Sequence, residues 1–378
     1  MAHAGDLDKS FSGNGKRAIS FGGTDAAQAV LVQPNGRIVI AGGGGAAMRF
    51  CAARLGAAGK LDTTFGPAGK RKIDFGGTLD QGVFGAARQP DGKLVLVGDS
   101  DLRVAVARLN TNGTLDSSFS GDGKMIFSWG AISRATAVVV MPSGKLLLGG
   151  FSGPEGGDMQ VARLNANGTL DTGFGTGGKV AIDFGGTEFG QALARQANGR
   201  ILIAGRSDIA GAIVARLRTN GALDPDFGTG GRVTLPSGGI ARSVMVQTDR
   251  KILVAGGSND AMFVTRLNPS GSLDPGYGVN GTATIDFAPL DDQAGGAVLQ
   301  ADGKVVIAGS VQDGGDFGVA RLNPDGSLDA GFGSGGKALV DFGVAVFAFA
   351  VALQPNGRIV VAGQRSGSDD FAVARLIG

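Results

Sequence analysis

The sequence predicts an all-β protein, a seven-bladed β-propeller of four-stranded antiparallel blades. The first observation is a repeat: Arg-Leu, a turn that contains Gly, Leu-Asp, and an aromatic residue three positions after the Asp. The second is that each unit contains four short apolar runs separated by turn residues. A period of 50 to 55 residues with four such runs is typical of one propeller blade per repeat. The Asp of the repeat stands at Asp8, Asp62, Asp116, Asp171, Asp224, Asp274 and Asp329.

One repeat shows how a blade is expected to form. We expect strands over residues 191–196, 200–205, 212–217 and 231–235. Asn198-Gly199 separates the first two apolar runs, and this dipeptide between such runs is a strong hairpin signal. The runs are almost continuously apolar, which is typical of a sheet that neighbours cover on both faces.

The two ends of the chain predict how the ring closes. The sequence begins with the material of a fourth strand, residues 16–21, and stops after a third strand, residues 371–376. We therefore expect the last blade to combine three C-terminal strands with one N-terminal strand, which removes two exposed sheet edges. Because no linker or charge run interrupts the repeat, residues 1–378 are expected to form a single β-propeller domain.

The periodic charges and aromatic rings are interpreted as structural. In six repeats an Arg precedes the Asp by eight residues, which predicts an ion pair across the turn. Arg375 and Asp8 remain, and the expected closure would bring them together as the seventh pair. The recurrent aromatics are expected to wedge between blades; they are Phe11, Phe65, Phe119, Phe174, Phe227, Tyr277 and Phe332.

Two segments of the repeat, residues 323–329 (Asn-Pro-Asp-Gly-Ser-Leu-Asp) and 354–363 (Gln-Pro-Asn-Gly-Arg-Ile-Val-Val-Ala-Gly), give the chain a family resemblance. With Phe332-Gly333 and Asp341-Phe342-Gly343 between them, they resemble the bacterial delta-60 repeat family. The resemblance covers essentially the whole chain. It implies propeller blades in an exported or surface-associated bacterial protein, and it implies no particular activity.

Composition limits the location and the partners. Ala2-His3-Ala4 is similar to the end of a secretory signal peptide, so the mature chain is expected to begin at Gly5 and to be secreted or at the cell surface; a cytoplasmic start is the alternative. A net charge of +2 without a basic cluster argues against nucleic acid. No apolar stretch is long enough to span a membrane. We expect a monomer.

Residues that interrupt the repeat mark the candidate site. In a propeller with this strand order, the loops that enter each inner strand and the loops between second and third strands share the face around the channel mouth. We expect that face to bind a protein or a small polar ligand; ordinary solvated loop charges are the alternative. The predicted ligand-binding residues are Arg49, Arg103, Trp129, Arg134, Glu188, Arg242, Asp292 and Phe347.

Two classes of function remain open at this point. The first is a non-enzymatic binding or scaffold protein. The second is a lyase, cyclase or hydrolase in which Glu188 or Asp292 acts as base and Arg134 or Arg242 stabilises an oxyanion. His3 is the only histidine, which excludes a Ser-His-Asp triad and a His-ligated metal.

No catalytic residue, cofactor or metal site is predicted. The Asn/Asp-rich turns faintly resemble calcium loops but lack the run of carboxylates that a calcium ion needs. The lone cysteine, Cys51, lies in an apolar run and is interpreted as a structural thiol.

Overall fold

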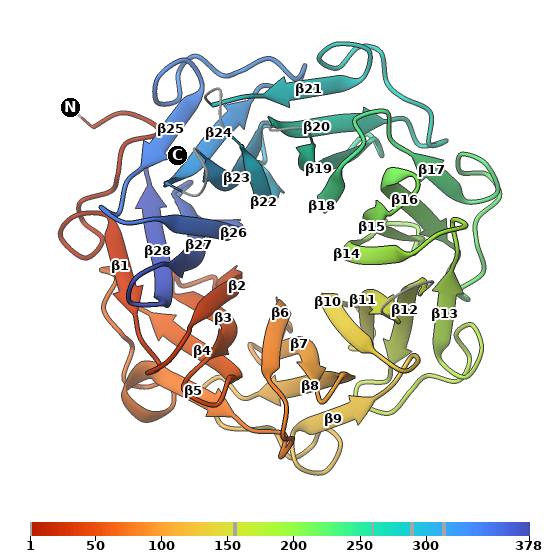
Figure 1. Ribbon diagram of the computed structural model, residues 1–378, viewed down its shortest axis with the longest axis horizontal. Helices are drawn as coiled ribbons and strands as arrows, with labels where there is room; N and C mark the ends of the chain where they lie inside the picture. The colour runs from red at the N-terminus through yellow and green to blue at the C-terminus, as the bar shows by residue number, and fades with distance from the viewer. Residues whose placement is uncertain (1, 154–156, 259–260, 288–290, 312–314) are drawn as a thin grey trace.

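The computed structural model describes the chain except residues 1, 154–156, 259–260, 288–290 and 312–314. In this part, 28 strands form seven four-stranded antiparallel sheets. The sheets stand in a ring around a central opening (Figure 1). The predicted fold class, a seven-bladed β-propeller, is confirmed. Within the same part of the chain, no helix is long and apolar enough to cross a membrane.

The blades are numbered 1 to 7 in the order of their inner strands. The inner strands are β2 (Ala26–Val32), β6 (Gln81–Arg88), β10 (Ser133–Val140), β14 (Glu188–Arg195), β18 (Ile240–Val246), β22 (Gln293–Leu299) and β26 (Val346–Leu353). The second strands are β3 (Ile38–Gly44), β7 (Leu94–Ser100), β11 (Leu146–Ser152), β15 (Ile201–Ser207), β19 (Ile252–Ser258), β23 (Val305–Val311) and β27 (Ile359–Arg365).

The outer half of each blade is a third strand and a short fourth strand. The third strands are β4 (Arg49–Leu55), β8 (Arg103–Leu109), β12 (Met159–Leu164), β16 (Gly211–Leu217), β20 (Ala261–Leu267), β24 (Asp316–Leu322) and β28 (Asp370–Leu376). The fourth strands are β5 (Lys70–Ile73), β9 (Lys124–Phe127), β13 (Lys179–Ile182), β17 (Arg232–Thr234), β21 (Thr282–Ile285), β25 (Lys337–Val340) and, in blade 7, β1 (Lys16–Ile19).

The N-terminal strand closes the ring as predicted. β1 pairs antiparallel with β28, with Lys16 opposite Ala374 and Ile19 opposite Phe371. The Arg375 guanidinium reaches Asp8 at 2.9 Å, which completes the seventh ion pair. The amide of Gly333 donates to the carbonyl of Ala4 at 2.8 Å, the same contact between blades that Gly175 makes with Asn220. A chain that starts at Gly5 would lack this acceptor, and processing at that position stays a prediction.

The arginine that recurs in each repeat has the predicted structural role and an additional one. In blade 1, Arg54 Nε donates to Asp62 at 2.7 Å, and its guanidinium lies 4.8 Å from the centre of the Phe65 ring. It also donates to the Thr111 carbonyl of blade 2. The arginine thus ties the turn of its own blade to the next blade. The remaining Arg–Asp pairs lie at 2.5–2.9 Å and form in every blade.

Side chains from adjacent blades form the core. The seven recurrent aromatics are 0–1% exposed, which agrees with their expected place between blades. Cys51 is fully buried, and burial raises the pKa of its thiol to about 12, as expected of a structural thiol.

Candidate binding site in the central channel

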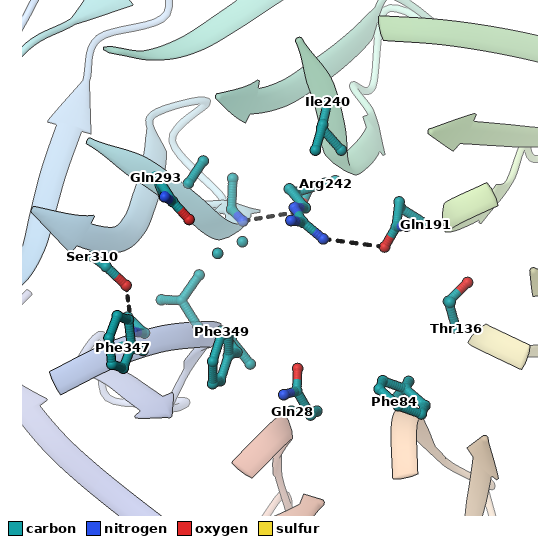
Figure 2. A pocket seen from close by; sticks show the side chains of 18 of the residues that line it. Gln28, Phe84, Thr136, Gln191, Ile240, Arg242, Gln293, Ser310, Phe347 and Phe349 are labelled. Atoms are coloured by element: carbon teal, nitrogen blue, oxygen red, sulfur yellow. Dashed lines mark hydrogen bonds between the residues drawn. The ribbon is translucent and has the colours of Figure 1, made fainter. Parts of the chain in front are cut away.

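Every inner strand carries one β-bulge at the same position. On β2 the pairing with β3 shifts between Ala27 and Ala29, and equivalent shifts occur on the other six inner strands. The extra residue at a bulge is unpaired, so its side chain can be aimed away from the sheet. All seven bulged residues line the central cavity, where Figure 2 shows several of them converging. They are Gln28, Phe84, Thr136, Gln191, Arg242, Gly295 and Phe349.

A glycine on the second strand makes room for each bulge. A Cβ on Gly42 would lie 1.8 Å from the carbonyl oxygen of Ala26, and one on Gly98 would lie 1.7 Å from that of Gly82. No side chain fits at such distances, so the backbone of the inner strand approaches closely only because these positions are glycine. The other five are Gly150, Gly205, Gly256, Gly309 and Gly363.

The cavity has a volume of about 570 Å³. Its second ring of side chains comes from residues two positions before the bulges, including Arg134, Phe189 and Phe347. The second strands add Phe151, which pairs with Arg134, and Arg206, which pairs with Phe189. The wall therefore contains three arginines and five phenylalanines, and none of its described residues is an Asp or a Glu.

Two of these arginines make cation–π contacts with phenyl rings of the cavity wall. The guanidinium of Arg134 lies 4.3 Å from the centre of the Phe84 ring and pairs with Asp99 at 3.3 Å. Arg206 lies 4.8 Å from the centre of the Phe189 ring. A cation over an aromatic face is attracted by the ring and loses little freedom when it binds a ligand. These contacts preorganise cationic groups at the wall.

Arg242, at the bulge of β18, is the third arginine of the cavity wall. Its Nη1 donates to Gln191 Oε1 at 3.3 Å, a contact between the adjacent inner strands β18 and β14 that Figure 2 shows. Solvent reaches this side chain, yet the channel walls surround its guanidinium. This loss of hydration, together with the charge of Arg206, lowers the pKa of Arg242. An anion placed between the two arginines would relieve their repulsion.

The structure brings together only some of the predicted site residues. Arg134, Arg242 and Phe347 line the central cavity. Arg49 lies on the outer part of the blade in an ion pair with Asp74 at 3.1 Å. Arg103 is exposed at the start of β8.

Three further predicted residues serve the loops. Trp129 packs edge-on against Phe127, with ring centres 5.5 Å apart. Glu188 is fully buried, and its Oε1 accepts from the Gly186 amide at 3.0 Å and from Ser207 Oγ at 3.1 Å. Asp292, 3% exposed, accepts from the Phe287 amide at 2.6 Å. The two carboxylates hold the loops that enter β14 and β22, and neither is among the described residues of the cavity wall.

A family of known sequences matches this chain in seven segments between residues 33 and 376. The family is described as a domain of unknown function (DUF5122) beta-propeller, and it matches residues 33–65, 89–119, 142–174, 196–227, 247–277, 300–332 and 354–376. The chain belongs to this family. The seven matches confirm the expected seven-repeat propeller family. None of the curated proteins matches the sequence.

Several solved structures share the fold at low sequence identity. YCF48 bound to D1 peptide is 10% identical with a TM-score of 0.55, over 99% of this chain and 98% of that one. A protein from Lactobacillus plantarum is 13% identical with a TM-score of 0.57, over 87% and 89%. The extracellular domain of a putative hybrid two-component system from B. thetaiotaomicron is 11% identical with a TM-score of 0.52, over 95% of this chain and 39% of that one. At these identities the similarity shows the propeller fold alone.

Proposed function

We propose that the protein is a non-enzymatic binding propeller whose central cavity takes a ligand with a carboxylate beside an apolar or aromatic group. The observation that carries this proposal is the composition of the cavity wall. Arg134, Arg206 and Arg242 stand there with five phenylalanines, without an Asp or Glu among the described lining residues. A guanidinium donates two parallel hydrogen bonds to a carboxylate, which makes arginine well suited to recognise it.

The cavity has the size and the mixed lining of a ligand site. Its volume of about 570 Å³ lies within the range of roughly 300–1,000 Å³ that is usual for such sites. Burying the apolar part of a ligand against the phenyl rings provides affinity, and the arginines fix its orientation. The required chemistry could belong to a segment of a partner protein or to a small organic acid.

Between these two sources we favour a peptide segment of a partner protein. The structural neighbour YCF48 was solved with a peptide bound, which supports the use of this fold for peptide recognition. An exported or cell-surface location is part of the proposal and is based on residues 2–5. Fractionation of cells that express the natural chain would test that location.

Isothermal titration calorimetry on the full chain tests the proposed ligand. The probes are phenylacetate and a short peptide that ends in Phe with a free carboxylate. Each acid is compared with the corresponding amide. We expect the peptide acid to bind, phenylacetate to bind more weakly or not at all, and each amide to bind at least about tenfold more weakly than its acid, since a charged hydrogen bond contributes about 1.5–3 kcal/mol. Binding of the peptide but not of phenylacetate supports a protein segment as the ligand. Binding of both equally would favour a small organic acid.

Substitutions locate the site. Arg242→Gln and Arg206→Gln should weaken binding of the acid, whereas Arg103→Gln, at the start of a third strand and absent from the cavity wall, should leave it unchanged. The proposal is wrong if acids and amides bind equally, if none of the probes binds, or if Arg242→Gln has no effect.

The enzymatic alternative has less support. A general base must reach the reacting group, and both candidate carboxylates, Glu188 and Asp292, are buried in loop contacts. The part of the cavity wall that the structure describes offers no other carboxylate.

A further inference from the structure

One position on the outer part of the blade carries different charges in different blades. In blade 1 the register of β4 and β5 places Arg49 beside Asp74, and the two form an ion pair at 3.1 Å. Gln81, which begins the inner strand of blade 2, donates through Nε2 to the other oxygen of Asp74 at 3.1 Å. The Asp74 carboxylate thus has a guanidinium on one side and an amide donor on the other.

The equivalent position in blade 3 holds three carboxylates. The register of β12 and β13 places Asp158 beside Asp183, where blade 1 has Arg49 beside Asp74. Glu188 begins the inner strand of blade 4, where Gln81 begins that of blade 2. One oxygen from each of Asp158, Asp183 and Glu188 lies within 4.8 Å of the others. Both donors of blade 1 are thus replaced by acceptors, and like charges directly opposite on two strands are destabilising.

The buried member of this cluster has an oxygen without a hydrogen-bond partner. Glu188 is 0% exposed, and Oε1 makes the loop contacts described above. Oε2 is buried as well and accepts no hydrogen bond from the described residues. A buried carboxylate oxygen is strongly unfavourable unless a donor or a cation satisfies it.

Two basic side chains near the cluster have contacts of their own. The Arg232 guanidinium lies 5.9 Å from the centre of the Phe184 ring. Lys179 lines the same surface depression as Asp158. Its ammonium group, however, donates to the Ser128 carbonyl at 2.7 Å and lies 5.6 Å from the centre of the Phe127 ring.

We propose that Asp158, Asp183 and Glu188 bind a divalent cation, with calcium as the best fit, between blades 3 and 4. Calcium prefers carboxylate oxygens at about 2.3–2.6 Å, so two oxygens on one ion lie at most about 5 Å apart. The separation of at most 4.8 Å meets this condition. Asp183 is exposed and Asp158 partly exposed, which leaves room for the water molecules that complete the coordination of calcium. The ion would take the place that the Arg49 guanidinium has in blade 1.

Blade 6 provides a matched comparison within the same chain. There Asp316 lies beside Asp341, as the register of β24 and β25 shows. The residue at the position of Glu188 is Val346, and Lys16 donates to the carbonyl of Asp341. A basic residue lies near both clusters, Lys16 over the Phe342 ring in blade 6 and Arg232 over the Phe184 ring beside Asp183. The difference is that blade 6 has two carboxylates where blade 3 has three, and we do not assign a cation to it.

Calcium titration by calorimetry on the full chain, after treatment with a chelator, tests the proposal. We expect one saturable site and a thermal midpoint that rises with the logarithm of calcium concentration. Glu188→Gln keeps an oxygen for Gly186 and Ser207 but removes the charge, so calcium affinity should fall at least about tenfold. Asp316→Asn, the matched control, should leave it unchanged.

Asp158→Arg provides a second variant with a different expected result. It reproduces the Arg49–Asp74 arrangement, so it should abolish calcium binding while the thermal midpoint without calcium stays equal or rises. Because it restores an ion pair, it should fold even if Glu188→Gln does not. The proposal is overturned if the wild-type chain shows no saturable binding of calcium, or if binding persists unchanged in Asp158→Arg.

Discussion

Replacing Tyr277 by Phe should stabilise the protein. Tyr277 is 1% exposed, and its hydroxyl has no hydrogen-bond partner among the described residues. The other six repeats have Phe at this position. The ring of Tyr277 lies 4.6 Å below the Arg266 guanidinium, against 4.5–4.8 Å in the other blades, so the hydroxyl is the difference.

The expected gain follows from two opposing terms. An unsatisfied buried hydroxyl costs about 1–3 kcal/mol of folding free energy. The space left by one oxygen costs less than about 0.5 kcal/mol. Tyr277→Phe should therefore raise the free energy of unfolding by about 0.5–3 kcal/mol. For a chain of 378 residues that unfolds as one unit this is a rise of about 1–4 °C in the thermal midpoint.

Urea unfolding followed by circular dichroism measures this change, and the reverse substitution is its control. Phe227→Tyr introduces the hydroxyl at the same position of blade 4 and should lower the free energy of unfolding by about 1–3 kcal/mol. If Tyr277→Phe destabilises the protein, the hydroxyl must bind a buried water, and the reasoning fails.

Three other predictions concern the recurrent Arg–Asp pairs and the cysteine. Burial opposes ionisation of Asp8, but hydrogen bonds from Ser10 and Arg358 lower its pKa to about 2. The stability that this lowered pKa contributes is present above about pH 4 and is lost toward pH 2. If circular dichroism shows that this stability is already lost above pH 5, the assignment is contradicted. Asp8→Ala leaves Arg375 buried without its carboxylate and should lower the free energy of unfolding in urea by about 3–5 kcal/mol. Asp224→Ala in blade 4 is the matched control and should have the same effect. If Asp8→Ala alone lowers it by less than about 1 kcal/mol, the N-terminal segment does not close the ring. Cys51, buried and with its thiol pKa raised to about 12, should react with a thiol reagent at pH 8 only after denaturation, and rapid labelling of the native chain would refute its burial.

The fold could be predicted because its determinants are local and repeated. Hairpin turns such as Asn198-Gly199 and the Arg–Asp spacing of eight residues stand in the sequence once per blade. The incomplete blades at the two ends left a single way to close the ring. The strand borders were less accurate: β14 begins at Glu188, three residues before the predicted start at residue 191. The bulge at Gln191 interrupts the alternation of buried and exposed side chains along β14. Residues 188–190, which lie before the bulge, were therefore not recognised as part of the same strand.

The cavity wall could be predicted only in part. Arg134, Arg242 and Phe347 depart from the repeat and were identified, whereas Phe84 and Gln191 lie inside apolar strands and resemble ordinary strand residues. The sequence does contain a signal for Phe84 and Gln191. The second apolar run of each repeat contains a glycine near its end, and a recurrent glycine inside a strand often marks a bulge in the strand that pairs with it. The carboxylates of Asp158, Asp183 and Glu188 were not recognisable as a group, because they come from three strand ends in two blades.

The side chains that line the channel differ between blades, whereas the contacts that hold neighbouring blades together recur in each of them. The Arg–Asp clamp and the aromatic wedge recur because each holds two blades together, whereas a bulged side chain points out of its sheet and contributes little to that packing. The bulge position can therefore differ from blade to blade without loss of the fold. At the bulge position, Arg242 belongs to blade 5 and Phe349 to blade 7, and Figure 2 shows both in the channel. Beside the bulges, Arg134 and Arg206 of blades 3 and 4 extend the cationic side, and Phe347 extends the apolar side at blade 7. Because Phe84, Phe151 and Phe189 contact the arginines, the proposed ligand would place its anionic group toward blades 3 to 5 and its apolar group toward Phe347 and Phe349 of blade 7.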